Sequence, residues 1–195
     1  MSNIVALPQQ RYTSDAIRLH WLMAGLIVLA VATGLLFDDI PKAWEQRFLN
    51  IHAILGVIIL ALLAIRISWR LKHQPPPLPA SIGPHNRLAS HYGHLALYGL
   101  MAVVPLAGLV TLLARGTGID FGLFEILSPL ARTPEIARPA KQLHGLLAYA
   151  LIAMALGHMA VAMVHQFVLR DGLLARMMPK RAGTAGPIRK AVKKS

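Results

Sequence analysis

Histidine is the side chain whose placement in this sequence could support chemistry. Seven of its nine histidines lie within or near the ends of long apolar segments: His20, His52, His91, His94, His144, His158 and His165. An ionisable group at membrane depth is costly and marks a functional site by default, although a hydrogen bond between helices accounts for a single histidine equally well. A proton relay would normally include Asp or Glu among the spans, and these segments contain neither. The set therefore favours ligands for a cofactor.

Four segments free of Asp, Glu, Lys and Arg carry these histidines, at 19–37, 48–65, 88–114 and 142–169. Each is close to or longer than the roughly 20 apolar residues that cross a bilayer as a helix, and none shows the period-two alternation of a strand. Pro105 should kink the third helix without ending it. The sequence therefore predicts an all-α integral membrane protein, an up-down-up-down four-helix bundle with helices at about 16–37, 48–70, 88–114 and 141–169.

The connecting segments are distinct in composition. Residues 74–84 contain five prolines and cannot be helical. In the longer loop at 116–138, we expect Phe121, Phe124, Ile126 and Leu127 to form a short interfacial helix. We expect one transmembrane domain over residues 1–181, followed by a disordered basic tail over residues 182–195 on the cytoplasmic side.

Charge indicates the orientation of the bundle. The chain carries a net charge of +12, but only 14% of its residues are charged and 55% are apolar, which argues against a nucleic-acid partner. With four spans, the side that holds both termini has 14 of the 20 Lys and Arg residues, and the other side has 6. The positive-inside rule then predicts a multi-pass membrane protein with both termini in the cytoplasm.

The depth of four histidines follows from this topology. His20 lies at the cytoplasmic end of the first helix, and His52 lies near the periplasmic end of the second. His144 lies near the periplasmic end of the fourth helix, and His158 follows 14 residues later, roughly 21 Å deeper and only about 40° around the helix. The fourth helix thus offers one ligand near each membrane surface. His52 and His144 form an outer pair, and His20 and His158 form an inner pair.

Two histidine pairs stacked in a bundle core are what two six-coordinate haems require. Neither level has the thiolate or carboxylate that would complete a tetrahedral zinc site, and the chain contains no cysteine. Two axial histidines leave the iron no open position, which suits electron transfer rather than oxygen binding. Gly56, Gly145 and Gly157 would make room for a macrocycle beside the histidines, whereas Gly34 is expected to pack bare helices together.

The histidines alone leave alternatives open. His165, about 20° from the same face, could bind iron in place of His158. His91 and His94 lie on the third helix at the cytoplasmic level. They could hydrogen-bond a haem propionate or a quinone, and either could displace His20 as a ligand.

Three arginines near the span ends have two interpretations. We expect Arg66 and Arg70 to extend to the cytoplasmic surface, as long cationic side chains do near membrane boundaries. Pairing with a haem propionate is the alternative for both, and it applies equally to Arg115 at the outer end of the third helix.

The chain resembles the bacterial cytochrome b561 family of four-helix, dihaem membrane cytochromes over about residues 12–181. The matching fragments are Arg18-Leu19-His20-Trp21-Leu22, Ile51-His52 with Gly56, Gly93-His94-Leu95 followed by Tyr98, Pro105-Leu106-Ala107-Gly108, Arg115-Gly116, Leu143-His144, Leu156-Gly157-His158, and Leu174-Ala175-Arg176-Met177-Met178-Pro179. Their order and spacing carry the resemblance more than any single fragment does.

This resemblance implies two haem b groups with His20, His52, His144 and His158 as the axial ligands, in agreement with the depth argument. It also implies electron exchange with ubiquinone, and at least one type in the family oxidises superoxide to oxygen. The expected partners are membrane lipid, a quinone, an electron donor and a second copy of the chain in a homodimer.

Three functional hypotheses follow from these observations. The first is a dihaem cytochrome, an electron-transfer oxidoreductase that passes electrons from a periplasmic donor to the ubiquinone pool. Superoxide suits this role because it is a small anion that Arg115, Arg132, Arg138 and Lys141 could attract, although only locally, since the outer side is neutral by count. The second is a cytochrome b anchor subunit that receives electrons from a partner dehydrogenase or hydrogenase. The third is a non-haem four-helix membrane protein that handles metal or protons.

Overall fold

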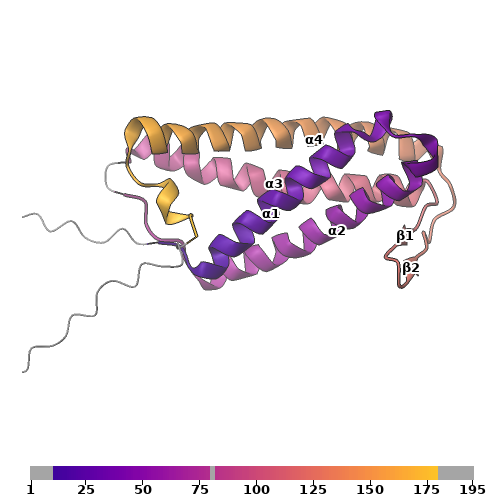
Figure 1. The fold of residues 1–195 in the computed structure, drawn as a ribbon, viewed down its shortest axis with the longest axis horizontal. Coiled ribbons are helices and arrows are strands. Elements are labelled where there is room, and N and C mark those ends of the chain that lie inside the picture. Colours follow the sequence, from indigo (N-terminus) through magenta and orange to yellow (C-terminus); the bar gives the residue numbers. More distant parts are fainter. Residues whose placement is uncertain (1–10, 80–81, 180–195) are drawn as a thin grey trace, which may run out of the picture.

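The computed structural model describes residues 11–79 and 82–179. Its four long helices run alternately up and down an elongated molecule (Figure 1): α1 (Ser14–Leu35), α2 (Lys42–Lys72), α3 (Pro84–Ala114) and α4 (Pro134–Met163). A π-helical segment, Val164–Leu169, continues α4. All four helices are long and apolar enough to cross a membrane, so the predicted all-α membrane bundle is confirmed. The expected tail at 182–195 lies outside the described residues.

The helices extend further at their starts than the charge-free segments indicated. α2 begins at Lys42 rather than about residue 48, and α4 begins at Pro134 rather than about residue 141. Their first turns contain Glu45 and Glu135, whose negative charges favour the positive end of the helix dipole. Proline at the first position also starts α3 and α4, where its missing N–H has no helical partner to lose. Charge therefore marks the membrane boundary here and not the helix boundary.

The expected interfacial helix around residues 121–127 is wrong. The segment forms a hairpin of two short antiparallel strands, β1 (Ile119–Asp120) and β2 (Glu125–Ile126), with Ile119 opposite Ile126. Gly122 between them adopts φ +83°, a conformation that glycine permits and a helix would not. The side chain of Asn50 on α2 accepts from the backbone N–H of Asp120 at 2.9 Å and donates to its carbonyl oxygen, which fastens β1 to the bundle.

Two names are used below for the ends of the bundle. The hairpin end holds β1 and β2, and the terminus end holds the start of α1 and the end of α4 (Figure 1). The segment 73–79 at the terminus end is not helical, as its prolines predicted. α3 continues through Pro105 to Ala114, so this proline does not end the helix.

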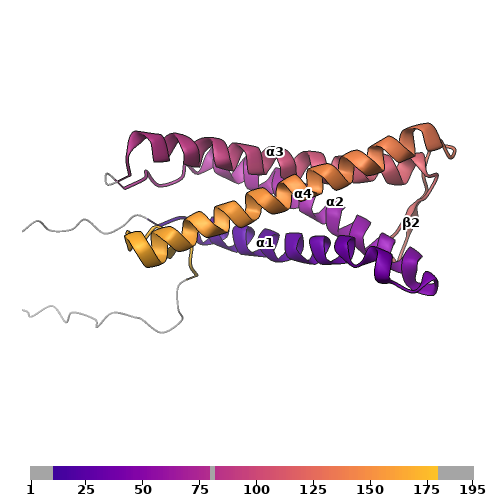
Figure 2. The same ribbon diagram turned by 90° about the horizontal axis from the view of Figure 1, so that it is seen from above.

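Helix packing is uneven around the bundle. α3 packs closely against α4, and α2 packs closely against both α1 and α3. Among the described residues, α4 makes no comparably close backbone packing with α1 or α2, and it crosses the bundle obliquely (Figure 2). A small buried cluster occupies the middle: Met23, Leu63, Met101, Val104 and Leu151. Contact between α4 and either α1 or α2 therefore has to be made by side chains.

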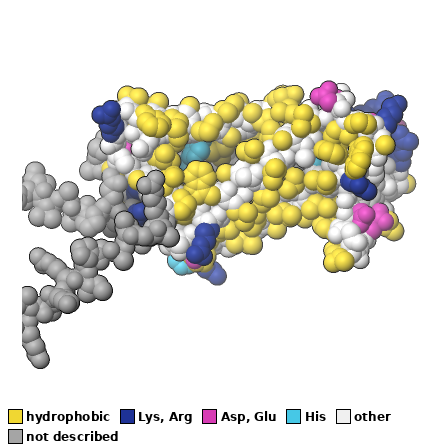
Figure 3. Space-filling view, viewed as in Figure 1, with side chains coloured by type: hydrophobic (Ala, Val, Ile, Leu, Met, Phe, Trp, Pro, Cys, Tyr) yellow, Lys and Arg dark blue, Asp and Glu magenta, His cyan; other side chains and the backbone are white. Residues whose placement is uncertain are grey.

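The outer surface of the bundle is apolar. Side chains such as Val28 and Leu146 are 66% and 69% exposed. Figure 3 shows apolar side chains over the middle of the molecule, with Lys and Arg gathered toward its two ends and histidine visible within the apolar belt. Such a surface is stable in a bilayer, where the hydrocarbon core covers it.

Candidate functional site

At the hairpin end, His52 on α2 and His144 on α4 face each other. Their ring centroids are 5.9 Å apart, and the ring planes are nearly perpendicular at 87°. These helices are not closely packed backbone to backbone, so the two imidazoles span the space between them. The structure thus brings together the outer pair that the sequence predicted.

Each outer histidine has a hydrogen-bond partner at Nδ1. His144 donates from Nδ1 to the carbonyl oxygen of Val104 on α3 at 2.9 Å. Nδ1 of His52 lies 3.0 Å from Oγ1 of Thr33 on α1. This hydroxyl can donate to the carbonyl oxygen of Ala30 at 2.9 Å and accept from His52 at the same time. The proton on Nδ1 of His144 leaves its Nε2 free to bind a metal, and His52 can adopt the same tautomer with Thr33 as the acceptor.

Two glycines allow these rings to occupy their positions. A Cβ atom at Gly108 on α3 would lie 3.0 Å from both Cε1 and Nδ1 of His144, and one at Gly34 on α1 would lie 3.3 Å from Cε1 of His52. Gly34, expected only to pack helices, therefore makes room for a histidine ring. Gly145 and Gly157 have no neighbouring atom within 4 Å of such a Cβ position, so they make no close contact with either ring.

At the terminus end, three histidines from three helices lie together. The ring centroid of His158 on α4 is 6.4 Å from that of His20 on α1 and 5.3 Å from that of His94 on α3. His94 donates from Nδ1 to the carbonyl oxygen of Ser90 at 2.6 Å, which leaves its Nε2 free. Within the described residues the ring of His158 makes no hydrogen bond. The predicted inner pair, His20 and His158, is therefore in contact. His94, the alternative ligand to His20, contacts His158 as well.

His20 has a cationic neighbour. Nη2 of Arg66 on α2 lies 3.4 Å from Nδ1 of His20. Arginine can only donate, so in this arrangement the neutral His20 ring carries its proton on Nε2. The same guanidinium donates from Nε to the hydroxyl of Tyr98 on α3 at 3.2 Å, and Arg70 donates to that hydroxyl at 3.4 Å. The predicted extension of these arginines to the surface is incomplete, because both converge on a half-buried phenol.

His165 and His91 are the two remaining alternatives that the sequence left open. His165, in the π-helical segment, is 2.5 Å from a carboxylate oxygen of Asp171, and both side chains are largely covered at 12% and 16% exposure. Burial alone would raise the pKa of Asp171, but hydrogen bonds from His165 and from the backbone N–H of Leu173 lower it overall. His91 is exposed and contacts Tyr92. No ring contact joins either histidine to another one in the part of the chain that the structure describes.

Four cations surround a pocket of about 520 Å³ at the hairpin end. They come from the C-cap of α3, the loop before α4 and the start of α4: Arg115, Arg132, Arg138 and Lys141. None of them forms an ion pair with a described acidic residue. The pocket adjoins the outer pair, because Lys141 lies one turn before His144 and Thr111 lies one turn after Gly108. A small anion would be attracted to this position.

The ring separations within the two pairs are those that a metal bound between two imidazoles requires. With a metal–nitrogen distance of about 2 Å on each side, the ring centroids would be roughly 6 Å apart, close to the observed 5.9 and 6.4 Å. No group of three or more His, Asp or Glu side chains that could hold a metal ion occurs in residues 11–79 and 82–179. Two ligands per level suit an iron whose other ligands come from a porphyrin, and they do not suit a tetrahedral ion.

Sequence reasoning missed the groups that orient the ligands. The Thr33 hydroxyl and the carbonyl oxygens of Ser90 and Val104 are the hydrogen-bond partners of the Nδ1 atoms, and only tertiary packing brings Thr33 and Val104 to their rings. Ser90 is the exception, because it precedes His94 by four residues on α3. That spacing alone could have indicated the bond.

Comparison with known proteins matches residues 11–180 to the family described as prokaryotic cytochrome b561. The chain is 33% identical to cytochrome b561 homolog 2 of Escherichia coli K12, over 91% of this chain and 96% of that protein. It is 32% identical to the probable superoxide oxidase CybB of Yersinia pestis, over 89% and 99%. It is also 30% identical to cytochrome b562 of Cereibacter sphaeroides, over 87% and 96%.

These matches cover all four helices and both histidine groups. The family name implies haem b, the cofactor that the paired imidazoles fit, and four apolar helices agree with a bacterial membrane location. The chain therefore belongs to the prokaryotic cytochrome b561 family and is an integral membrane protein of electron transfer.

Proposed function

We propose that this chain is a dihaem b-type cytochrome of the bacterial inner membrane that transfers electrons from a donor at the hairpin end to ubiquinone. The observation that carries the proposal is the presence of two interhelical histidine groups, one at each end of the bundle, with ring separations that suit six-coordinate iron. Leu151 lies seven residues from both His144 and His158, in an apolar layer between the two levels.

At the outer level, His52 and His144 would hold one haem through their free Nε2 atoms. At the inner level, His158 would hold the second haem with His20 opposite it, and His94 is the competing ligand. A haem iron with two axial imidazoles supplies one-electron exchange without an open coordination position. The protein fixes the rings through Thr33 and Val104, and such outer hydrogen bonds orient metal ligands.

Superoxide is the donor that the basic pocket suits best. Arg115, Arg132, Arg138 and Lys141 present four positive charges beside the outer pair, and clustered charge raises the local concentration of a small anion. The relative from Yersinia pestis is named a probable superoxide oxidase. Two superoxide anions would each give up one electron and leave as oxygen, and the two electrons with two protons would convert a quinone to a quinol.

This direction of transfer requires the hairpin end to face the periplasm. The distribution of cations supports it, because the side of both termini carries 14 Lys and Arg residues against 6 on the other side. Both termini would then lie in the cytoplasm, and the inner haem would be the one closer to the cytoplasmic surface.

The test is a haem-reduction assay of the purified, oxidised protein. A b-type reduced-minus-oxidised spectrum with two haems per chain is expected, with rapid reduction by superoxide and reoxidation by added ubiquinone. Ascorbate and ubiquinol serve as comparison donors. A colourless protein would exclude both haem hypotheses. Haem that superoxide does not reduce, but that a copurifying dehydrogenase does reduce, would identify an anchor subunit instead.

A further inference from the structure

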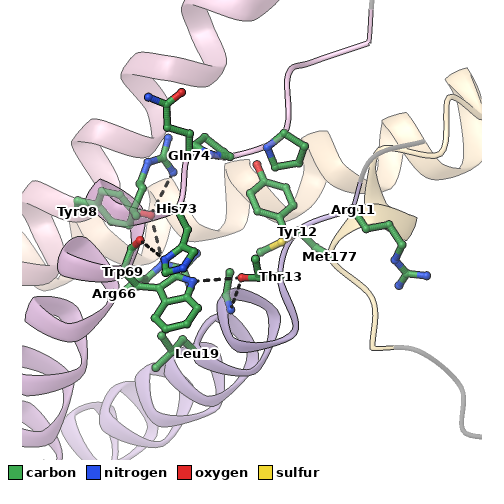
Figure 4. Close-up of a pocket in the computed structure, with 14 residues that line it drawn as sticks. Arg11, Tyr12, Thr13, Leu19, Arg66, Trp69, His73, Gln74, Tyr98 and Met177 are labelled. Atoms are coloured by element: carbon green, nitrogen blue, oxygen red, sulfur yellow. Dashed lines mark hydrogen bonds between the residues drawn. The ribbon is translucent and has the colours of Figure 1, made fainter. Parts of the chain in front are cut away.

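A second pocket lies at the terminus end, next to the inner histidine group, because Leu19 and Arg66, which neighbour His20, both line it. Its volume is about 370 Å³. Arg66, Trp69 and Arg70 of α2 and Tyr98 of α3 line it, with Leu19 of α1 and Met177 of the C-terminal segment. Figure 4 shows Arg66 and Tyr98 side by side, with Tyr12 and Met177 on the far side of the space.

The charges in this pocket are unbalanced. Arg66 and Arg70 both donate to the hydroxyl of Tyr98, and their guanidinium carbons lie 5.8 and 5.7 Å from the centre of its ring. Within the described residues neither arginine is paired with a carboxylate. The two acids at this end have other partners, since Asp15 binds Arg18 and Asp171 binds His165. Two half-buried cations that share one neutral acceptor need an anion.

The pocket adjoins the inner histidine group. Arg66 follows His52 by 14 residues on α2, the spacing that separates His144 from His158 on α4. Arg66 therefore shares the core-facing side of α2 with His52 and lies one ligand level further along. It reaches His20 at 3.4 Å, and Tyr98 lies one turn beyond His94 on α3.

The contact between Arg66 and His20 has to change when His20 binds a metal. A metal-bound Nε2 requires the imidazole proton on Nδ1. Nδ1 then becomes a donor and can no longer accept from Nη2 of Arg66. The freed guanidinium needs another acceptor close by. A carboxylate satisfies it best, because the planar fork of arginine binds carboxylates through two parallel hydrogen bonds.

We propose that Arg66, Arg70 and Tyr98 bind the propionate carboxylates of the inner haem and thereby position that haem and raise its reduction potential. The proposal rests on the dihaem function proposed above. The site lies between α2 and α3, beside a ligand histidine and under Met177, so an anion attached to the haem suits it better than a lipid phosphate. These residues are cofactor-positioning residues.

The test compares Arg66→Gln and Arg70→Gln with Lys72→Gln, an exposed cation on the same helix and at the same end. The inner haem is first identified as the one lost in His158→Ala. Potentiometric titration should show its midpoint potential shifted downward in both arginine variants, because a lost positive charge favours the oxidised haem. The outer haem and Lys72→Gln should not shift. Arg66→Lys should recover most of the potential, and the propionate bending bands in resonance Raman spectra should move in Arg66→Gln.

The other possible outcomes either contradict the proposal, support it or refute the function on which it rests. Arginine variants whose two midpoints match those of Lys72→Gln, or in which only the outer haem shifts, would show that the arginines do not contact the inner haem. A shift present in vesicles with phosphatidylglycerol and absent in pure phosphatidylcholine would identify a lipid phosphate as the anion. Loss of the inner haem in Arg66→Gln, restored in Arg66→Lys, would support the proposal. A wild-type protein without haem would instead refute the proposed function.

Discussion

The imidazole of His144 on α4 donates its Nδ1 proton to the carbonyl oxygen of Val104 on α3, 2.9 Å away. This bond joins the two most closely packed helices of the bundle. It holds the ring with Nε2 directed away from α3, which leaves that nitrogen for a metal. α3 supplies no ligand at this level, yet it fixes the orientation of one, and Gly108 provides the space for the ring.

We expect Gly108→Ala to weaken outer haem binding. The added methyl group would lie 3.0 Å from Nδ1 and Cε1 of His144, closer than ordinary van der Waals contact, so the ring must shift away from Val104. Such overpacking costs about 1–3 kcal/mol. The matched control is Gly99→Ala on the same helix, where no atom lies within 4 Å. Haem content per chain should fall in Gly108→Ala and stay unchanged in Gly99→Ala. Equal haem content in the two variants would contradict the predicted contact.

We expect His52→Ala and His144→Ala to abolish the same haem. Each histidine is the only imidazole opposite the other at the hairpin end among the described residues, so removal of either leaves the iron without an axial ligand. Reduced-minus-oxidised spectra should show that each variant keeps one haem. Potentiometric titration should give this remaining haem the same midpoint potential in both variants. Variants that retain different haems would show that the two residues do not form one pair.

At the inner level, His158→Ala should remove the second haem, because His158 contacts both His20 and His94. The identity of its partner is resolved by His20→Ala and His94→Ala. We expect His20→Ala to lose the inner haem, and His94→Ala to keep it with an altered potential. The reverse result would make His94 the ligand. His165→Ala should keep both haems, since Asp171 holds this side chain. If His165→Ala instead lost one haem while His158→Ala kept both, His165 would be the inner ligand in place of His158.

We expect Lys141→Gln to slow reduction by superoxide without changing haem content. Lys141 is one of four cations beside the outer pair, and removal of one charge from such a cluster should lower the rate by up to about tenfold at low salt. The difference from wild type should diminish as ionic strength rises. The control is Lys42→Gln, a cation at the same end that does not line the pocket. Equal rates of reduction by superoxide in the two variants would show that this pocket does not attract the donor.

Much of the architecture could be predicted from the sequence because two strong patterns carry it. Apolar segments of membrane length predict helices directly, and the 14-residue spacing between His144 and His158 places both on one helical face whatever the packing. The charge count adds the expected orientation. These signals are local in sequence, and they do not depend on which helices contact each other.

The remainder depends on contacts between distant segments. Nothing in the chain near Gly34 indicates that His52, on another helix, lies against it. The pairing of Asn50 with Asp120 likewise joins residues 70 positions apart, and it stabilises a hairpin where apolar composition suggested a helix. Arg66 looked like a surface cation because its contacts with His20 and Tyr98 arise only when three helices assemble.

The pair of Asp171 and His165 should make stability depend on pH. Hydrogen bonds lower the folded-state pKa of Asp171 despite its burial, so the ionised carboxylate stabilises the fold. This contribution is fully present above the unfolded-state pKa of about 3.9 and is lost as pH falls through the lowered folded-state value. A hydrogen bond to a charged group contributes about 1.5–3 kcal/mol.

We therefore expect Asp171→Asn to unfold at a lower temperature than wild type at pH 7, by about 2–4 °C per kcal/mol lost. The difference should shrink below about pH 4, because protonated Asp171 is then as uncharged as asparagine. Loss of haem absorbance on heating measures the unfolding midpoint of each protein across the pH range. Asp38→Asn, an exposed carboxylate at the hairpin end, is the control and should match wild type. A difference that persists at low pH would show that the carboxylate charge does not stabilise the end of α4.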